Sequence, residues 1–142
     1  MIGIIDLGSS NLGSIQNLLK SLKVKYKLIK KNRTTNFSDF DKIILPGVGS
    51  FKSAMDKLKK NDLINFLNLA YKKNIPILGI CLGMQLMCKH STEGGNTKGL
   101  GWFNIEINRF NQKKVKKIPI IGWNNVLQAK KDKIFNNINS NS

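Results

Sequence analysis

The sequence predicts an α/β protein built on a mostly parallel sheet that is flanked by helices. Short apolar runs alternate with amphipathic segments along most of the chain, which is the pattern of repeated strand–helix units. Pro46-Gly47 stands where the third apolar run ends, as expected for a strand-to-helix turn. With 142 residues, of which 41% are hydrophobic and 23% are charged, the chain has the size and composition of one globular domain. We therefore predict a single domain over residues 1–142.

Four apolar runs are expected to form the strands of this sheet. Apart from the second, which carries two lysines, they are short and almost continuously apolar, which is typical of buried strands. Pro46-Gly47 closes the third run, and Pro76 and Cys81 bracket the fourth. The predicted strands are Ile2–Asp6, Lys25–Ile29, Lys42–Leu45 and Ile77–Ile80.

Four segments between and after these strands are expected to be helical: Asn11–Leu22, Ser50–Lys60, Leu63–Lys73 and Leu82–Lys89. In the first, leucine and isoleucine recur at i, i+3, i+4 and i+7, which predicts one buried face. The residues on that face are Ile15, Leu18, Leu19 and Leu22. In the third, Leu63, Phe66, Leu67 and Ala70 form the equivalent face.

The last part of the chain predicts a hairpin-like β extension appended to the sheet. Thr92–Gly101 is rich in glycine and polar residues and is expected to be a loop. Strands are expected within Trp102–Phe110, Val115–Ile121 and Trp123–Leu127, and the Asn/Ser-rich tail Asn136–Ser142 is expected to fray.

The net charge of +16 raises the question of a nucleic-acid partner. Of the 24 basic residues, 22 are lysines, spread in runs no longer than two, and only Arg33 and Arg109 are arginines. Specific recognition of phosphates and bases relies on the arginine fork. We therefore predict a solvated lysine surface and no nucleic-acid partner; a nucleic-acid binder, the alternative, would bind with a steep dependence on salt.

Cysteine content and hydropathy predict a cytoplasmic protein without a membrane segment. No apolar run approaches the roughly 20 residues that span a bilayer, and the first residues lack the basic region of a secretory signal. Cys81 and Cys88 would lie roughly 10 Å apart along a helix, too far for a disulfide. We expect Cys88 in the core, free thiols and no zinc site.

Gly79-Ile80-Cys81-Leu82-Gly83 follows an apolar run and precedes a helix-forming stretch, as in a nucleophile elbow that carries Cys in place of Ser. A sharp strand-to-helix turn lifts such a side chain above the sheet, and the helix N-terminus favours its thiolate. The backbone N–H of Leu82 would point to where an oxyanion forms. The same five residues are also compatible with a buried cysteine between two packing glycines.

Pro46-Gly47-Val48-Gly49 supplies the second signal, because it ends the third predicted strand. Two glycines around one residue allow the backbone to turn an N–H group towards a ligand. Since parallel strands end at one shared edge, we expect this segment and Cys81 to lie at the same edge of the sheet.

These motifs resemble those of class I (triad) glutamine amidotransferases, which have a flavodoxin-like fold. Among them, the chain resembles the glutaminase subunits of imidazole glycerol phosphate synthase. The resemblance extends over nearly the whole chain. It rests on Ile43–Phe51, Gly79–Leu86, Ile4–Gly8 with Asn11 and Leu12, Gly99-Leu100-Gly101, and Pro119 with Gly122-Trp123-Asn124.

The resemblance implies that the protein hydrolyses glutamine and passes the ammonia to a (β/α)₈ cyclase subunit, in a heterodimer that serves histidine biosynthesis. It also implies that the glutaminase uses no metal and no organic cofactor. Cys81 would be the nucleophile, and the N–H groups of Leu82 and of Val48, the latter after a peptide flip, would form the oxyanion hole. Four residues match positions that line the glutamine pocket: Gly47, Gly49, Gln85 and Glu93. Glu93 would hold the ammonium group of the substrate.

The sequence departs from the family pattern in two respects. The family's base is a His two residues before a Glu, well after the Gly-Trp-Asn motif, and this sequence has no such pair. Its single histidine, His90, is expected at a helix C-terminus, out of reach of Cys81. We therefore expect a truncated domain that reacts at Cys81 but turns over little glutamine.

The second departure is Ile120, where the family usually has His. Together the two departures leave two alternatives open. One is a related amidotransferase subunit that supplies nitrogen to surface sugars, and the other is a catalytically inactive binding subunit.

Overall fold

The computed structural model describes residues 1–8, 11–32, 36, 39–110, 122, 125 and 127–138. The chain divides into two compact units, residues 1–109 and 110–142. No helix among the described residues is long and apolar enough to cross a membrane.

The first unit contains two sheets and four helices among its described residues. Sheet A is formed by β1 (Ile2–Ile5), β2 (Tyr26–Ile29), β3 (Lys42–Gly47) and β4 (Ile77–Cys81). Sheet B is formed by β5 (Cys88–Ser91), β6 (Thr97–Lys98) and β7 (Phe103–Ile107). The helices are α1 (Leu12–Ser21), α2 (Phe51–Lys60), α3 (Leu63–Lys72) and α4 (Leu82–Leu86).

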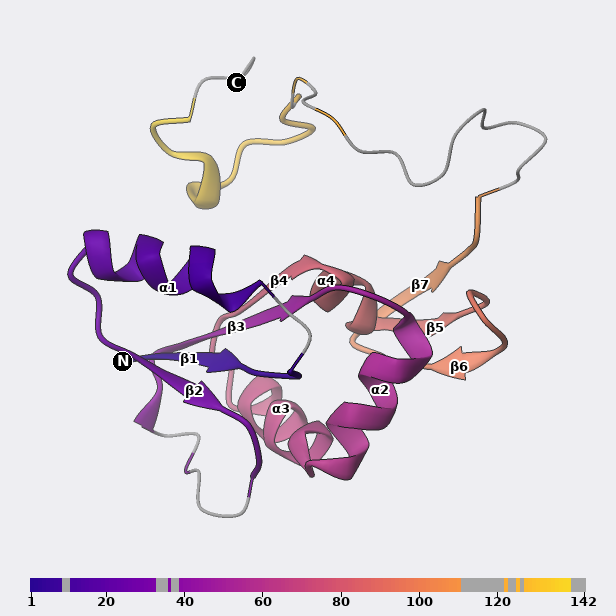
Figure 1. Ribbon diagram of the computed structural model, residues 1–142. Coiled ribbons are helices and arrows are strands. Elements are labelled where there is room, and N and C mark those ends of the chain that lie inside the picture. Colours follow the sequence, from indigo (N-terminus) through magenta and orange to yellow (C-terminus); the bar gives the residue numbers. More distant parts are fainter. Residues whose placement is uncertain are drawn as a thin grey trace. The chain divides into compact units, whose positions relative to one another are not determined.

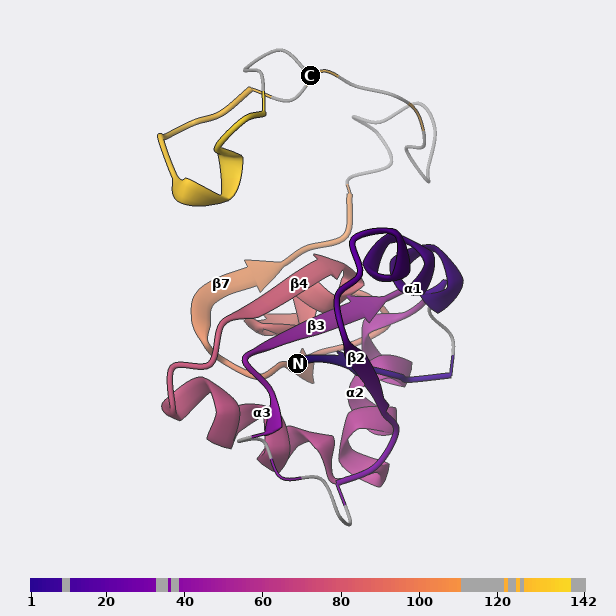
Figure 2. The same cartoon turned by 90° about the vertical axis from the view of Figure 1, so that its left-hand side faces the viewer.

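Sheet A has the order β2-β1-β3-β4, and all its neighbouring strands are parallel. Helix α1 lies on one face, and α2 and α3 lie on the opposite face (Figures 1 and 2). This arrangement confirms the predicted mostly parallel sheet with helices on both sides. The strands run from the edge near the N-terminus towards sheet B, so their carboxyl ends meet at one edge (Figure 1).

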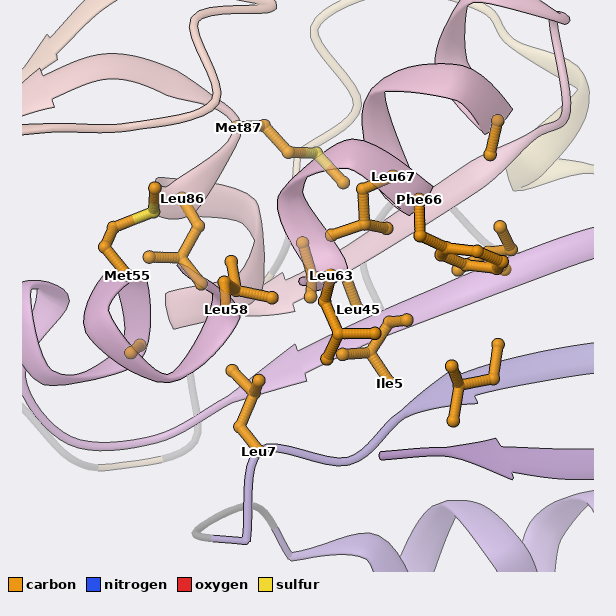
Figure 3. Packing of buried hydrophobic residues seen from close by; sticks show 14 of the residues in the cluster. Ile5, Leu7, Leu45, Met55, Leu58, Leu63, Phe66, Leu67, Leu86 and Met87 are labelled. Carbon is orange, nitrogen blue, oxygen red and sulfur yellow. The ribbon is translucent and has the colours of Figure 1, made fainter. Parts of the chain in front are cut away.

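The main core lies between sheet A and the helices α2 and α3. Apolar side chains from β1 and β3 contact a layer of leucine and phenylalanine from the two helices (Figure 3). The predicted face of α3 is buried throughout, because Leu63, Phe66, Leu67 and Ala70 are all 0 or 1% exposed. Met55, Leu86 and Met87 extend the same cluster towards α4.

The opposite face of sheet A is covered less completely by α1. Ile4 of β1 and Leu19 of α1 are buried, whereas Leu18 and Leu22 are exposed by 58% and 61%. The predicted apolar face of α1 was therefore wrong for these two leucines. A single helix covers only part of a four-stranded sheet, and Leu78 of the edge strand β4 is accordingly 46% exposed.

Sheet B takes the place of the end of one predicted helix and of part of one predicted loop. The predicted helix Leu82–Lys89 ends at Leu86, and β5 begins two residues later. The predicted loop Thr92–Gly101 contains β6, which pairs antiparallel with β5. The expected strand within Trp102–Phe110 is confirmed as β7, but it pairs parallel with β5 in a separate sheet and does not extend sheet A.

Hydrogen bonds from a distant segment explain why α4 is short. The N–H of Leu100 donates to the carbonyl of Leu86 at 2.8 Å, and the N–H of Trp102 donates to the carbonyl of Met87 at 2.9 Å. These carbonyls are therefore satisfied without a further helical turn. Trp102 also donates from its indole Nε1 to Asn68 Oδ1 at 2.8 Å and stacks on Tyr71, which fastens the segment to α3.

The described part of the second unit holds a 3₁₀ helix, η2 (Lys133–Phe135), which is capped by Asp132 through the N–H of Ile134. The strand predicted over Val115–Ile121 lies outside the described residues. Of the strand predicted over Trp123–Leu127, only Asn125 and Leu127 are described, and neither is in a strand. Asn139–Ser142, the end of the tail expected to fray, also lie outside the described residues.

Candidate active site

The candidate site lies where β3 and β4 end. Gly47 and Cys81 are register partners in these two parallel strands, and Pro46 pairs with Ile80 one residue earlier. The predicted placement of the Pro46–Gly49 segment and Cys81 at one sheet edge is therefore confirmed. Strand β3 extends through Pro46 and Gly47, beyond its predicted end at Leu45.

Cys81 occupies a strained backbone conformation at the junction of β4 and α4. Its φ of 54° and ψ of −119° lie outside the regions that L-residues normally adopt, at a cost of roughly 1–3 kcal/mol. Such a conformation persists only where the surrounding structure enforces it. The result is a free cysteine that is exposed at the carboxyl edge of the sheet, which supports the elbow interpretation over a buried packing cysteine.

Close backbone contacts explain the two glycines that flank this turn. A Cβ at Gly83 would overlap the carbonyl oxygen of Leu45, and a Cβ at Gly79 would lie 2.6 Å from Cα of Met84. Real Cβ atoms do not approach backbone atoms so closely, so only glycine fits at either position. The glycines thus allow α4 to pack directly onto the end of sheet A, with the side chain of Leu82 buried beneath it.

The turn after β3 forms the other side of the candidate site, opposite the junction of β4 and α4. Gly49 has a φ of 98°, which favours glycine, and Val48 is 47% exposed. Ser50 then caps α2 by accepting a hydrogen bond from the N–H of Ser53 at 3.2 Å. This cap ends the turn at a defined residue, and Val48 directly follows Gly47, the register partner of Cys81.

The two remaining predicted site residues lie on different elements. Gln85 is half-buried on α4, about one helical turn beyond Cys81. Glu93 is exposed on the turn that joins β5 to β6, and therefore belongs to sheet B. The structure thus brings Gly47, Val48, Gly49, Cys81 and Leu82 to one edge, places Gln85 on the adjoining helix and places Glu93 on a separate sheet.

His90 lies in a different environment from the one expected. It belongs to strand β5 and not to a helix C-terminus, and its Nε2 lies 3.7 Å from Glu106 Oε1 across the sheet. The expectation was wrong because it assumed that α4 continues to Lys89. His90 thus lies beside Glu106 of β7.

The second cysteine is a core residue, as predicted. Cys88 is 5% exposed, its sulfur lies 3.9 Å from the carbonyl of Met84, and burial raises the pKa of its thiol. Both thiols are free. Among the described residues, no group of three His, Cys, Asp or Glu side chains could hold a metal ion.

Ser91 was missed by the sequence analysis. It is fully buried, and its hydroxyl oxygen accepts a hydrogen bond from the N–H of Glu93 at 3.1 Å. The signal available in the sequence was the Ser-x-Glu spacing, since serine commonly binds the backbone N–H two residues later in a turn.

Comparison with known proteins gives consistent results. The family model "Glutamine amidotransferase class-I" matches residues 3–142. The chain is 39% identical over 145 residues to imidazole glycerol phosphate synthase subunit HisH of Leptospira interrogans, covering 99% of this chain and 70% of that protein. It is 43% identical over 143 residues to subunit HisH 2 of Methanococcus maripaludis, covering 100% of this chain and 69% of that protein.

A solved structure described as a glutamine amidotransferase has the same fold. Its TM-score is 0.61 with 16% sequence identity, over 76% of this chain and 56% of that chain. At this identity the likeness concerns the fold alone, and it agrees with the parallel sheet A and its flanking helices. On the family match and on the identity to the HisH subunits, the chain belongs to the class-I glutamine amidotransferases.

Proposed function

We propose that this protein is the glutaminase subunit of an imidazole glycerol phosphate synthase and that it hydrolyses glutamine at Cys81. The observation that carries the proposal is the pairing of Cys81 with Gly47, which sets an exposed thiol beside a turn with two glycines at one sheet edge. The identity of about 40% to HisH subunits supports this assignment within the amidotransferase family.

The proposed reaction proceeds through a thioester. The thiolate of Cys81 attacks the carbon of the glutamine side-chain amide, a C–S bond forms, and the carbonyl oxygen becomes an oxyanion. When this intermediate collapses, the C–N bond breaks and the nitrogen leaves as ammonia after it takes up the proton that the Cys81 thiol gave up. Water then cleaves the C–S bond, which gives glutamate and restores the thiol.

The oxyanion is stabilised by the backbone N–H groups of Leu82 and Val48. Leu82 directly follows the nucleophile at the start of α4, and Val48 follows the register partner of Cys81. The Val48 N–H reaches the oxyanion after its peptide flips, and the positive φ of Gly49 supplies the necessary backbone freedom. Donors aimed at a developing oxyanion typically change the rate by about 10²–10³-fold each.

Glutamine is held by Gln85 and Glu93, with the backbone of Gly47 and Gly49 forming the adjoining side of the pocket. Gln85 presents a side-chain amide from α4 on the segment that carries the nucleophile. Glu93 presents an exposed carboxylate, the group that complements the ammonium of the substrate.

The ammonia passes to a (β/α)₈ cyclase subunit in a heterodimer, in the cytoplasm, as a step of histidine biosynthesis. The word "subunit" in the names of the HisH relatives supports a partner. The free state of Cys81 and Cys88 supports a reducing compartment.

The 142 residues supply a nucleophile without a histidine base beside it. The single histidine is His90, which is engaged with Glu106 in sheet B. Removal of one member of a catalytic triad typically lowers the rate by about 10⁴-fold. We therefore expect this chain to bind glutamine and react at Cys81, but to release ammonia very slowly; rapid ammonia release would contradict the proposed role of the family's histidine.

Alkylation of Cys81 tests the substrate assignment directly. The chain is treated with iodoacetamide in the presence of L-glutamine or, as a matched control, D-glutamine, and the adduct on Cys81 is quantified by peptide mass spectrometry. L-Glutamine is expected to slow the modification, and Cys81→Ala is expected to abolish it. Equal modification rates with the two enantiomers would overturn the proposed glutamine site.

Binding to a purified cyclase subunit tests the partner. We expect the wild-type chain and Cys81→Ala to bind equally, because the thiol serves the chemistry and not the docking. Failure of both to bind would remove the partner assignment. The alternatives are also separated here: protection of Cys81 by L-glutamine excludes a binding subunit without a glutamine site, and binding to the histidine-pathway cyclase disfavours the surface-sugar branch indicated by Ile120.

A further inference from the structure

The turn that carries Glu93 is anchored by a buried hydroxyl. Ser91 is 0% exposed and ends β5, the central strand of sheet B. Its hydroxyl oxygen accepts a hydrogen bond from the N–H of Glu93 at 3.1 Å, while the Glu93 side chain itself is exposed. The backbone of Glu93 is therefore held by a hydrogen bond to the buried Ser91 hydroxyl, and the Glu93 side chain lies on the surface.

Ser91 is itself held from both sides. It is the register partner of Thr97 in β6 and of Ile107 in β7. The next residue, Thr92, donates its N–H to the carbonyl of Ile107 at 3.0 Å and its hydroxyl to Asn108 Oδ1 at 3.2 Å. The anchor of the turn is thus part of a three-stranded sheet, whereas the turn beyond it contains Gly94 and Gly95, both with positive φ.

We propose that Ser91 is a positioning residue for the ammonium group of glutamine, and that it acts through the backbone of Glu93. The proposal rests on the function proposed above, in which Glu93 binds that group. Without the hydroxyl, the turn next to two glycines loses the hydrogen bond that selects its conformation, and the carboxylate samples positions from which it does not reach the ligand.

The experiment uses the full chain and the alkylation of Cys81 by iodoacetamide. Two quantities are measured for each variant: the modification rate without ligand, which reports the intact elbow, and the L-glutamine concentration that halves this rate. Ser91→Ala is compared with Ser91→Thr, which keeps the hydroxyl and suits a strand.

Ser91→Ala is expected to leave the modification rate without ligand unchanged and to raise the half-protecting glutamine concentration roughly five- to tenfold, the change that one net hydrogen bond carries. Ser91→Thr is expected to restore the wild-type value. Glutaramic acid, which resembles glutamine but lacks the amino group, is expected to protect wild type and Ser91→Ala equally. A loss of protection by both ligands would indicate a general structural role and would overturn the proposal.

Glu93→Gln provides a second control. If Ser91 acts through Glu93, Ser91→Ala adds no further loss of protection in the Glu93→Gln background. Additive losses would contradict the proposal.

The two proposals fail in distinguishable ways. If L-glutamine does not protect the wild-type chain, the glutamine site is wrong and this inference falls with it. If wild type and Ser91→Ala are protected at the same concentration, only the role of Ser91 is wrong. Should Ser91→Ala not fold, Ser91→Cys keeps the side-chain volume with a much weaker acceptor, and the same loss of protection is expected.

Discussion

Gly47 and Cys81 face each other as register partners at the carboxyl ends of β3 and β4. A Cβ at Gly47 would lie 2.9 Å from the backbone nitrogen of Gly83, so the end of β3 and the start of α4 are in close contact. The strained φ of Cys81 is therefore imposed by a close fit between two segments that are far apart in the sequence.

This fit predicts a severe effect of Gly83→Ala. The new Cβ would overlap the carbonyl oxygen of Leu45, and neither backbone can move without disturbing the elbow. We expect the free energy of unfolding, measured by urea titration, to fall by about 3 kcal/mol. We also expect the modification rate of Cys81 to change.

Gly13→Ala is the matched control for this substitution. Gly13 lies within α1, and its new Cβ would meet only Asn11 Oδ1, at 3.9 Å. Alanine favours helix over glycine, so the unfolding free energy is expected to rise by about 0.5 kcal/mol. Equal destabilisation by both substitutions would show that the close contact at Gly83 is not the cause.

Two neighbouring leucines of α1 are predicted to differ strongly. Leu19 is 6% exposed, whereas Leu18 is 58% exposed. Leu19→Ala is expected to lower the unfolding free energy by about 2–4 kcal/mol, and Leu18→Ala to change it by less than about 0.5 kcal/mol. Comparable losses in the two variants would mean that Leu18 is buried after all.

Trp102 and Asn68 are predicted to contribute to the free energy of unfolding in a coupled way, because the Trp102 indole donates a hydrogen bond to Asn68. In a double-mutant cycle, Trp102→Phe and Asn68→Ala are each expected to destabilise the chain, since each leaves a half-buried polar group without its partner. The double variant is expected to lose about 1 kcal/mol less than the sum of the single variants. Strict additivity in urea unfolding would indicate that the contact contributes nothing.

The buried thiol of Cys88 predicts a loss of stability at alkaline pH. Burial raises the pKa of this thiol, so the folded chain keeps the proton to higher pH than the unfolded chain does. The contribution of the protonated Cys88 thiol to the unfolding free energy is fully present below the ordinary thiol pKa. It is lost as the pH rises from that pKa to the higher pKa of the folded chain. From about pH 8.5 upward, the unfolding free energy of wild type is expected to fall more steeply than that of Cys88→Ala. Parallel pH profiles, measured under reducing conditions, would contradict this assignment.

The sequence was sufficient to predict the parallel sheet and the position of the elbow. Strands such as Ile77–Ile80 are short apolar runs, and α3 repeats its leucines and phenylalanine with the helical period, so the local pattern and the buried face agree. The glycines around Cys81 marked the turn because a close backbone approach can be read from residue type. The placement of Gly47 beside Cys81 then followed from the shared edge of parallel strands.

The tertiary structure decided where α4 ends, which side of α1 is buried and where His90 lies. The residues after Leu86 have a helical pattern, but the N–H groups of Leu100 and Trp102 satisfy the carbonyls that another helical turn would have used, and the chain forms sheet B instead. The helical periodicity likewise places Leu18 on an apolar face, but it does not determine whether any part of the sheet contacts that residue. Local sequence determines which conformations a segment favours, whereas long-range hydrogen bonds and the extent of the neighbouring surface select among them.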